Sequence, residues 1–252
     1  MKDRINKIKE FIDKKGRVTF AELEAAFPNV SYMTIRRDLK SLESASEVIL
    51  VKGGAVSVDG VIKTREEGLS QRINYNITEK LEIADKAVSL IIPKSCIYID
   101  GGSTTTYFAR ALPDDDYYIL TNALNIAEIC IRKDKPSVTI LGGDIKRHSF
   151  VTVGKSCSEF LGTVNIETAV MTATGFIKES GAFTCGSQAE AEVKRQVIEK
   201  AKKVIMLLDS SKVNKSTPYT FAVLEDVNCM VVDKNFPDFS RKDIESRGIA
   251  VI

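Results

Sequence analysis

A short loop of glycines and hydroxyl side chains is the part of this 252-residue chain whose residue types best suit ligand chemistry. It follows an apolar, β-branched run and precedes a helical pattern. Glycines let a ligand approach the backbone, hydroxyls donate hydrogen bonds, and a helix start supplies partly positive amides, so the loop suits a phosphate group. A plain strand-to-helix turn is the alternative, and no Gly-Lys-Ser or Gly-Lys-Thr follows as in a Walker loop. The loop consists of Asp100, Gly101, Gly102, Ser103, Thr104 and Thr105.

Similar residue types follow several other apolar runs. Asp209 could accept hydrogen bonds from sugar hydroxyls, and Lys212 could meet a phosphate or pair with an acid. Each such residue alone has an ordinary structural explanation. If the runs are parallel strands, however, their carboxyl ends share one edge of a sheet, where ligands bind in open α/β folds. The other members of this set are Thr121, Asn122, Gly142, Gly143, Gly154 and Gly175.

A second set of side chains forms one face of a helix predicted to begin at Ser31 and to run to about Ser44. At about 100° per residue, three cations and a methionine fall opposite an apolar stripe. An arginine can bind a DNA phosphate or read guanine with two hydrogen bonds, and Ser31 and Thr34 could hold a phosphate at the helix start. A solvated helix surface is the alternative. The stripe is Ile35, Leu39 and Leu42, and the opposite face is Met33, Arg36, Arg37 and Lys40.

The preceding sequence supplies two more helices. Apolar residues at helical spacing over 5–12 predict a first helix that ends at Gly16. Thr19 and Glu22 have the spacing of a capping box, in which each side chain satisfies an amide of the first turn. They predict a second helix that ends near Pro28.

The following sequence, residues 46–58, predicts a hairpin of two short strands. Its glycines, Gly53 and Gly54, can take the positive φ of a tight turn, and Lys52 lies beside them. Three helices followed by a hairpin form a winged helix-turn-helix. In that fold the third helix enters the major groove and the hairpin, here with Lys52, lies against the DNA backbone.

The rest of the chain has a different texture. Residues 59–75 are polar and predict a linker between a winged helix-turn-helix domain over 1–58 and a larger domain over 76–252. In the larger domain apolar runs alternate with amphipathic stretches, which predicts an α/β fold with a mainly parallel sheet. The predicted strands are 96–100, 117–122, 137–143, 167–175, 203–209 and 229–233, and the predicted helices are 79–91, 104–111, 124–132 and 188–201.

The composition excludes several classes of protein. It is 44% hydrophobic and 28% charged, as in a soluble globular protein. No window approaches ~18 uncharged apolar residues, and the N-terminus is charged where a signal peptide needs apolar residues, so a cytoplasmic location is expected. The 5 cysteines form no close pairs, so no metal and no cofactor are expected. The formal charge of +2 comes from the first 60 residues, which hold 11 basic and 9 acidic side chains.

Several of these stretches resemble the DeoR family of bacterial transcriptional regulators. TIRRDLKSLE followed by VKGGAV resembles the family signature, in which a TIRRDL recognition helix precedes a wing ending in HGGA. Leu50 and Lys52 stand where the family often has a basic residue and a histidine, so different wing contacts are expected. DGGSTT, TN, GG and DSSK are similar to motifs of the DeoR sensor domain, whose fold is similar to ribose 5-phosphate isomerase and the CoA-transferase group.

The resemblance implies an effector pocket. Glu190 and Lys194 are weaker candidates for it, and Arg147 could help neutralise an anionic ligand, whereas His148 is expected to be a solvated loop residue. Thr172 stands where family members commonly have glycine, and its side chain could narrow or repolarise the pocket. The effector's identity is therefore not transferred from relatives. The implied pocket residues are Asp100, Gly102, Ser103, Thr104, Thr105, Thr121, Asn122 and Lys212.

Together these features predict a DNA-binding transcriptional regulator, not an enzyme, whose operator binding is modulated by a phosphorylated sugar. The resemblance favours a repressor of a sugar uptake or catabolism operon. Expected partners are double-stranded operator DNA, the phosphorylated sugar and further copies of the chain in a dimer or tetramer, without a membrane. The alternative is a sugar-phosphate isomerase-like or CoA-transferase-like enzyme with an accessory DNA-binding domain, using Asp100, Glu190 or Asp209 as general base. An unregulated architectural DNA binder would leave the pocket-like loops unexplained.

Overall fold

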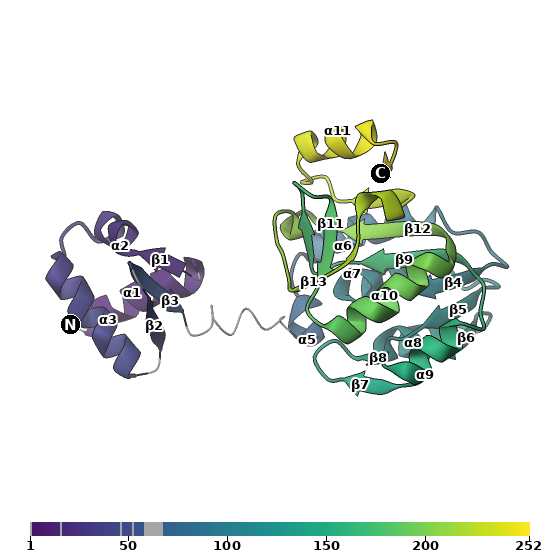
Figure 1. The fold of residues 1–252 in the computed structure, drawn as a ribbon, viewed down its shortest axis with the longest axis horizontal. Helices are drawn as coiled ribbons and strands as arrows, with labels where there is room; N and C mark the ends of the chain where they lie inside the picture. The colour runs from purple at the N-terminus through teal and green to yellow at the C-terminus, as the bar shows by residue number, and fades with distance from the viewer. Residues whose placement is uncertain (1, 16, 46, 52, 58–67) are drawn as a thin grey trace. The chain divides into compact units, whose positions relative to one another are not determined.

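Two separate hydrophobic cores divide the chain of this computed structural model into two units, residues 1–66 and 67–252 (Figure 1). The structure describes residues 2–15, 17–45, 47–51, 53–57 and 68–252. The predicted wing residue Lys52 and most of the predicted linker therefore lie outside the described residues. The two units are described one at a time.

In the part of the first unit that the structure describes, there are three helices and a small antiparallel sheet. The apolar spacing predicted all three helices. The capping box of α2 is confirmed, because Glu22 N donates to Thr19 Oγ1 over 3.2 Å and Thr19 N donates to Glu22 Oε2 over 2.8 Å. Ser31 is the N-cap of α3, as predicted. The elements are α1 (Lys2–Lys15), β1 (Arg17–Thr19), α2 (Phe20–Ala26), α3 (Tyr32–Ser44), β2 (Val48–Val51) and β3 (Gly54–Ser57).

Strand β1 is an element that the sequence pattern did not predict. It pairs antiparallel with β3, and the strand order is β1-β3-β2. Of the two wing glycines, Gly53 has a positive φ of 93°, whereas Gly54 is a strand residue. A Cβ on Gly54 would lie 1.9 Å from the carbonyl oxygen of Val18. The prediction that both glycines take a positive φ is therefore wrong for Gly54, whose missing side chain lets β1 approach.

The second unit is built on seven parallel strands in the order β15-β14-β12-β9-β4-β5-β6. All six predicted strands belong to this sheet. β15 was not predicted, because two residues are too few to show a period. The strands are β4 (Cys96–Ile99), β5 (Tyr118–Thr121), β6 (Ser137–Ile140), β9 (Ile166–Thr172), β12 (Ala201–Leu208), β14 (Cys229–Val232) and β15 (Ala250–Val251).

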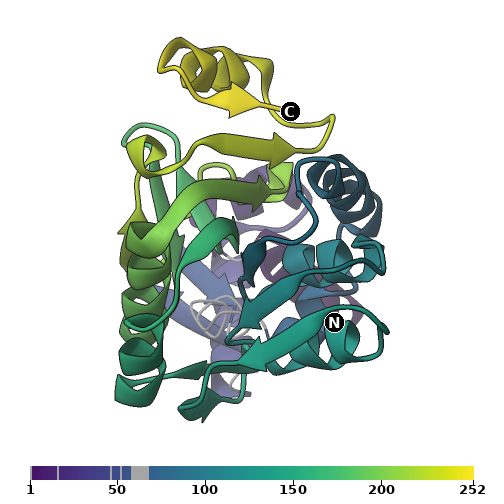
Figure 2. The same ribbon diagram turned by 90° about the vertical axis from the view of Figure 1, so that its right-hand side faces the viewer.

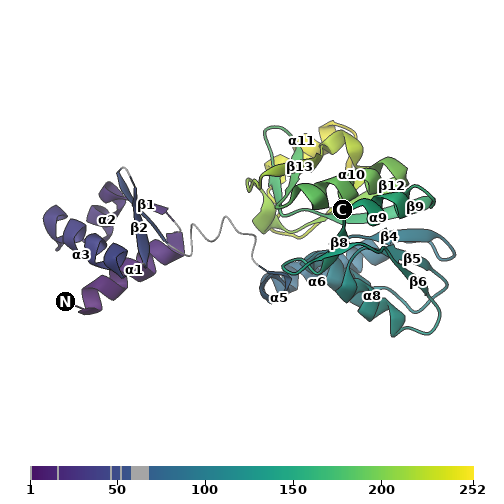
Figure 3. The ribbon, with the colours of Figure 1, turned by 60° about the horizontal axis from the view of Figure 1, so that its bottom comes forward.

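Helices cover both faces of this sheet. Figures 2 and 3 show α10 on one face and α6 and α8 on the other. The amphipathic pattern predicted α6, α7, α8 and α10, each end to within three residues, and missed α9 and α11. Within the described residues, no helix is long and apolar enough to cross a membrane. The helices are α6 (Ile77–Val88), α7 (Ser103–Ala111), α8 (Leu124–Ile131), α9 (Lys155–Leu161), α10 (Gln188–Lys200) and α11 (Asp238–Ser246).

The second unit also contains two small antiparallel sheets, β7-β8 and β10-β11-β13. The predicted strand 167–175 is wrong at its end, since β9 stops at Thr172 and Gly175 opens β10. A Cβ on Gly175 would lie 2.3 Å from the carbonyl oxygen of Lys215, so this glycine serves a close backbone approach. The strands are β7 (Asp144–Lys146), β8 (Val151–Val153), β10 (Gly175–Ile177), β11 (Ala182–Cys185) and β13 (Tyr219–Ala222).

A short helix, α5 (Leu69–Arg72), lies within the stretch predicted as a linker. It packs on the second unit: the side chain of Leu69 is 2% exposed, and its backbone N–H donates to the carbonyl oxygen of His148 over 2.8 Å. Four residues are a single turn, too short for an apolar period to be recognised. The end of the predicted linker is therefore a packed part of the second unit.

The chain changes its direction of progress across the large sheet between β4 and β9. From β4 it moves to β5 and β6, and from β9 it moves the other way to β12, β14 and β15. Ligands of open parallel sheets bind beyond the carboxyl ends of the strands next to such a switch point. The residues at these ends are Asp100 after β4, Thr172 at the end of β9 and Asp209 after β12.

Candidate DNA-binding surface and effector site

Helix α3 separates apolar and basic side chains as its sequence predicted. Its stripe of Ile35, Leu39 and Leu42 is buried, each residue at most 2% exposed. The opposite face is accessible: Met33 is 69% exposed. The three cations of this face, Arg36, Arg37 and Lys40, are exposed as well.

The start of α3 is closed by its own side chains. Ser31 Oγ accepts a hydrogen bond from Thr34 N over 3.3 Å and lies 2.9 Å from Thr34 Oγ1. Both hydroxyls thus satisfy the helix start, and a DNA phosphate would have to share or replace these bonds. Ser31 and Thr34 thus lie beside the basic face, but their hydroxyls already form hydrogen bonds at the helix start.

A part-buried ion pair that the sequence interpretation missed positions α3. Arg4 of α1 donates from Nε to Asp38 Oδ2 over 2.7 Å and from Nη2 to Asp38 Oδ1 over 3.1 Å. The hydrogen bonds to Asp38 hold the pKa of Arg4 above its ordinary value. Asp38 is 2% exposed although it lies between the exposed Arg37 and Lys40. This two-pronged contact fixes α3 against α1.

In the second unit, a buried ion pair lies at the switch point between β4 and β9. Asp100 and Lys194 form a salt bridge in which both side chains are buried. Asp100 Oδ2 also accepts Thr172 N over 3.1 Å, and Lys194 Nζ donates to the Thr172 carbonyl over 3.0 Å. Burial opposes the charge of Lys194, yet the attraction of Asp100 holds its pKa above the ordinary lysine value. The two charges neutralise each other, so Asp100 is engaged in a structural contact.

The neighbouring Thr172 does not turn its hydroxyl to a ligand. Its Oγ1 donates to the carbonyl oxygen of Leu207 over 3.1 Å. Its methyl group faces Gly102, where a Cβ would lie 2.4 Å from Thr172 Cγ2. The expectation that Thr172 changes the pocket's polarity is not supported by this geometry, because the side chain packs a methyl group against the glycine loop.

The glycine-hydroxyl loop opens α7 as predicted. Ser103, Thr104 and Thr105 are buried in the first turn, and Thr105 Oγ1 donates to the Gly102 carbonyl over 3.0 Å. Gly101 packs against Val151, since a Cβ there would lie 2.2 Å from Val151 Cγ1. No side chain caps this helix, so its first amides remain suited to an anion.

Thr121 and Asn122, predicted as pocket residues, use their polar atoms inside the protein. Thr121 Oγ1 donates to the Ile99 carbonyl over 2.6 Å and accepts Ala123 N over 3.0 Å. Asn122 Oδ1 accepts the Tyr98 hydroxyl over 2.8 Å, and Asn122 Nδ2 donates to the Thr152 carbonyl over 2.9 Å. Both residues hold neighbouring strands together at this edge.

A second cluster at the same edge surrounds Asp209, which is 1% exposed. Asp209 Oδ1 accepts Asn76 Nδ2 over 3.3 Å and Ser211 N over 3.1 Å. Its Oδ2 is buried and accepts no hydrogen bond within the described part of the chain. Lys212, at the end of the 3-10 turn η1 (Ser210–Lys212) that Asp209 caps, is half-buried. A buried carboxylate oxygen without a donor suits a ligand hydroxyl.

Lys80 is a functional candidate that the sequence interpretation missed. It is 2% exposed, and its Nζ donates to the carbonyl oxygens of Arg72 and Tyr75. Burial lowers its pKa to about 8, the attraction of Asp209 opposes this, and the nearby Lys212 and Arg72 lower it further. The signal was present, because Lys80 interrupts the otherwise apolar buried stripe of α6 with Ile83, Ala84 and Ala87.

Other predicted effector residues lie on or near the β7-β8 hairpin. Ser149 Oγ donates to Glu190 Oε1 over 2.6 Å, which links the hairpin to α10. Arg147, in the hairpin turn, is exposed, as is His148. Gly142 and Gly143 lead into β7 and are exposed, and Gly154 follows β8 with a φ of 101°. None of these three glycines has a polar side chain to offer, so each acts through its backbone.

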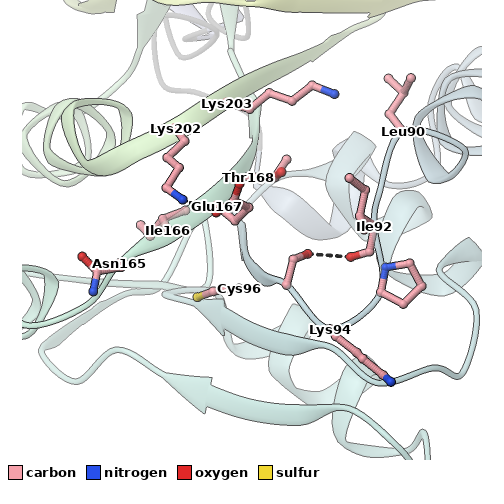
Figure 4. Close-up of a pocket in the computed structure, with 12 residues that line it drawn as sticks. Leu90, Ile92, Lys94, Cys96, Asn165, Ile166, Glu167, Thr168, Lys202 and Lys203 are labelled. Carbon is pink, nitrogen blue, oxygen red and sulfur yellow. Dashed lines mark hydrogen bonds and ion pairs between the residues drawn. The ribbon is translucent and has the colours of Figure 1, made fainter.

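A hollow of about 420 Å³ lies at the opposite edge of the sheet (Figure 4). It is lined by Cys96, Ile166 and Lys203, which stand at or near the amino ends of β4, β9 and β12. Lys202 and Glu167 of its lining form an ion pair of 2.8 Å between Nζ and Oε2. None of the predicted effector residues contributes to this hollow. In the described residues there is also no cluster of three His, Cys, Asp or Glu side chains that could hold a metal ion.

Comparison with known proteins places both units in one family. Residues 4–61 match the DeoR-like helix-turn-helix domain, and residues 75–234 match the DeoR C terminal sensor domain. The HTH-type transcriptional regulator GlpR of Haloferax volcanii is 31% identical over 254 residues, which cover 99% of this chain and 96% of that protein. The HTH-type transcriptional repressor GlcR of Bacillus subtilis is 28% identical over 232 residues, which cover 92% of this chain and 88% of that protein.

Among solved structures, ribose 5-phosphate isomerase A from Methanocaldococcus jannaschii is similar with a TM-score of 0.42 and 17% sequence identity, over 55% of each chain. The helix-turn-helix match covers the unit that contains α3, and the sensor-domain match covers the parallel sheet. Similarity to known regulators extends along nearly the whole chain. The chain belongs to the DeoR family and is a transcriptional regulator rather than an enzyme.

Proposed function

We propose that this protein is a cytoplasmic repressor of a sugar uptake or catabolism operon, and that a phosphorylated sugar bound at the carboxyl edge of its large sheet relieves repression. The chain's similarity to a repressor over most of its length supports the sign of the regulation. The exposed cations of α3 supply the DNA contacts, and the second unit supplies the effector site.

One observation carries the effector proposal: Lys80 is a buried cation whose two named acceptors are neutral backbone carbonyls. No carboxylate forms an ion pair with it among the described residues. Lys212 and Arg72 add positive charge nearby, against the carboxylates of Asp209 and Glu79, so the three cations exceed the two anions. The excess positive charge suits the phosphoryl group, and the α7 amides can share its oxygens. Asp209 Oδ2 can accept a hydrogen bond from a sugar hydroxyl. The cations and this carboxylate oxygen together favour a phosphorylated sugar over a plain anion.

In the DNA complex, the N-terminal part of α3 enters the major groove. Arg36 and Arg37 then reach base edges or phosphates, and Lys40 meets the backbone. Because each chain carries one such helix, we propose that a homo-oligomer places two of them on related half-sites. Replacing Arg36 or Arg37 with alanine should weaken operator binding by about 5- to 150-fold if the side chain reads a base.

The test uses the full-length protein and a DNA duplex that it selects from a random pool. Operator affinity is measured by fluorescence anisotropy with phosphorylated sugars and with their unphosphorylated counterparts. One phosphorylated sugar should weaken operator binding at least about tenfold, while its unphosphorylated form should have no effect. The effector proposal fails if no phosphorylated sugar changes the affinity, and the repressor proposal fails if the effector strengthens binding.

A further inference from the structure

Helix α5 is the first described element after the stretch that leads from the DNA-binding unit, and four hydrogen bonds hold it or the residues just after it. Leu69 N donates to the His148 carbonyl over 2.8 Å, and the Tyr107 hydroxyl donates to the Ile73 carbonyl over 3.2 Å. Lys80 Nζ donates to the carbonyls of Arg72 and Tyr75. The buried side chain of Leu69 completes the contact.

The three partners of this segment come from three different elements: α7, the turn between β7 and β8, and α6. Tyr107 belongs to α7, which opens with the glycine-hydroxyl loop. His148 precedes Ser149, whose hydroxyl donates to Glu190 of α10, the helix that carries Lys194. Lys80 is the buried cation of the site itself. Any ligand that orders these elements therefore acts on α5.

Lys80 provides the most direct connection between ligand and α5. An ammonium group has three N–H donors, and here two of them serve carbonyls at the end of α5 and just beyond it. The third donor remains for an anion. A bound anion would hold the ammonium charged and in place, and a charged ammonium donates stronger hydrogen bonds to the two carbonyls than a neutral amine does. Ligand binding and the attachment of α5 would then strengthen each other.

Resting on the effector site proposed above, we propose that α5 is the element through which the bound phosphorylated sugar controls the DNA-binding unit. The anion keeps the Lys80 ammonium charged and in place, so that its hydrogen bonds to the carbonyls of Arg72 and Tyr75 persist and fix α5 on the sensor unit. Because coupling is reciprocal, loosening α5 weakens the ligand's effect on DNA binding and also its affinity.

The first test is hydrogen–deuterium exchange of the full-length protein with and without inorganic phosphate, whose binding is measured in parallel by calorimetry. Saturating phosphate should slow amide exchange over residues 69–76 at least about fivefold. A peptide from α11 (Asp238–Ser246) serves as internal control and should not change. Unchanged exchange over 69–76 in the presence of bound phosphate would overturn the role of α5.

The second test uses Leu69→Ala, which removes the buried contact of α5 and leaves every proposed ligand group in place. This variant should exchange rapidly over residues 70–76 with or without phosphate. With the phosphorylated sugar that regulates the wild type, it should lose at least about four-fifths of the effect on operator affinity. Leu161→Ala, a buried leucine of α9, is the matched control for the loss of a core side chain and should keep the full effect.

The outcomes separate the two proposals. If neither phosphate nor any phosphorylated sugar binds, the effector site is wrong and the role of α5 falls with it. If a ligand binds and Leu69→Ala retains the full operator response, the effector site stands and α5 is not the coupling element. Tyr107→Phe, which removes only the hydrogen bond to the Ile73 carbonyl, should give a smaller loss of response in the same direction.

Discussion

Two buried lysines at the same edge of the sheet are held in opposite ways. Lys194 is paired with the carboxylate of Asp100, and this attraction keeps its pKa raised despite complete burial. Lys80 donates to two neutral carbonyls, and burial lowers its pKa to about 8. The first charge is neutralised by an ion pair, whereas the second forms no ion pair among the described residues.

One edge of the sheet thus combines a carboxylate-paired lysine with a lysine that we propose binds ligand. The Asp100–Lys194 pair bridges β4, α10 and the end of β9, so it fixes the strands at the switch point. Burying the charge of Lys80 destabilises the folded protein, and no ion pair among the described residues offsets this desolvation. A residue that stabilises the fold little and carries a charge without an ion pair is the one expected to bind ligand. The two sites should therefore respond oppositely to substitution.

The largest expected effect is on the free energy of unfolding, when the ion pair of Asp100 and Lys194 is broken. Asp100→Asn leaves Lys194 buried without its counter-charge and should lower the free energy of unfolding by about 3–5 kcal/mol. Urea unfolding at pH 7, followed by circular dichroism, measures this. Adding Lys194→Met should recover most of the loss, because the uncompensated charge is gone. A loss below about 1 kcal/mol in Asp100→Asn would mean that the pair is not structural.

The second largest effect is expected on the affinity for the ligand, when the cation of Lys80 is removed. Lys80→Met keeps a side chain of similar size but removes the cation, so it should weaken binding of the phosphorylated sugar about 10- to 100-fold. Its free energy of unfolding should change by less than about 1.5 kcal/mol, since the buried charge disappears with the hydrogen bonds. Calorimetry and urea unfolding measure the two quantities.

The control for Lys80→Met is Lys133→Met. Lys133 also donates to a backbone carbonyl, that of Leu112, over 2.7 Å, but it lies in the loop that leads from α8 to the start of β6, away from the proposed site. It should leave ligand affinity unchanged. A large stability loss without an affinity loss in Lys80→Met would make Lys80 a structural residue like Lys194.

Raising the pH should reveal the same contrast. With a pKa of about 8 in the empty site, Lys80 is mostly charged at pH 7 and mostly neutral at pH 9, so ligand affinity should fall up to about tenfold between them. The phosphate group keeps its charge over this range, since its second pKa is about 6. Lys80→Met should bind weakly at both pH values, and a wild-type affinity that does not vary with pH would remove Lys80 from the site.

The two lysines also have opposite linkage to folding. An unfolded lysine has a pKa near 10.5, above the folded value of Lys80. Between about 8 and 10.5 the unfolded chain binds the extra proton, so the stability contributed by Lys80 rises with pH. The raised pKa of Lys194 has the reverse consequence: its contribution is complete below 10.5 and is lost as the pH rises through the folded value.

The smallest effect is expected at Lys212, which is half-buried and better solvated than Lys80. Lys212→Ala should weaken ligand binding about two- to fivefold and leave operator binding without ligand unchanged. Calorimetry with the same sugar compares it with Lys80→Met. An equal loss in both variants would show that burial does not distinguish the two cations.

Local patterns predicted most of the DNA-binding unit. The capping box at Thr19, the N-cap at Ser31 and the apolar stripe of α3 each involve residues three to seven positions apart, which a helix brings together by itself. Strand β1 was missed because its three residues gain stability only from pairing with β3, about 37 positions later. The role of Gly54 follows from the same long-range pairing.

At the carboxyl edge of the large sheet, the sequence predicted which residues stand at the strand ends but not the partners of their polar atoms. Apolar runs and the glycine-hydroxyl loop were sufficient to place Asp100 and Asp209 at strand ends. The residue type at a strand end does not determine the hydrogen-bond partners of its polar atoms, however. Asn122, for example, forms its hydrogen bonds with the Tyr98 hydroxyl and the Thr152 carbonyl. Lys80 was overlooked because it lies on a helix that precedes the sheet, and its neighbours Arg72 and Asp209 are 8 and 129 positions away.

The order of most helices and strands, the basic face of α3 and the membership of the DeoR family could be read from the sequence, because each depends on residue types at short, regular spacing. Only the packed chain shows which of two buried lysines pairs with a carboxylate and which donates to neutral carbonyls. That choice depends on which elements pack around each ammonium group, α10 beside β4 for Lys194 and the turn after α5 for Lys80. Burial and pairing are properties of the packed chain, so neither can be determined from spacing along the sequence.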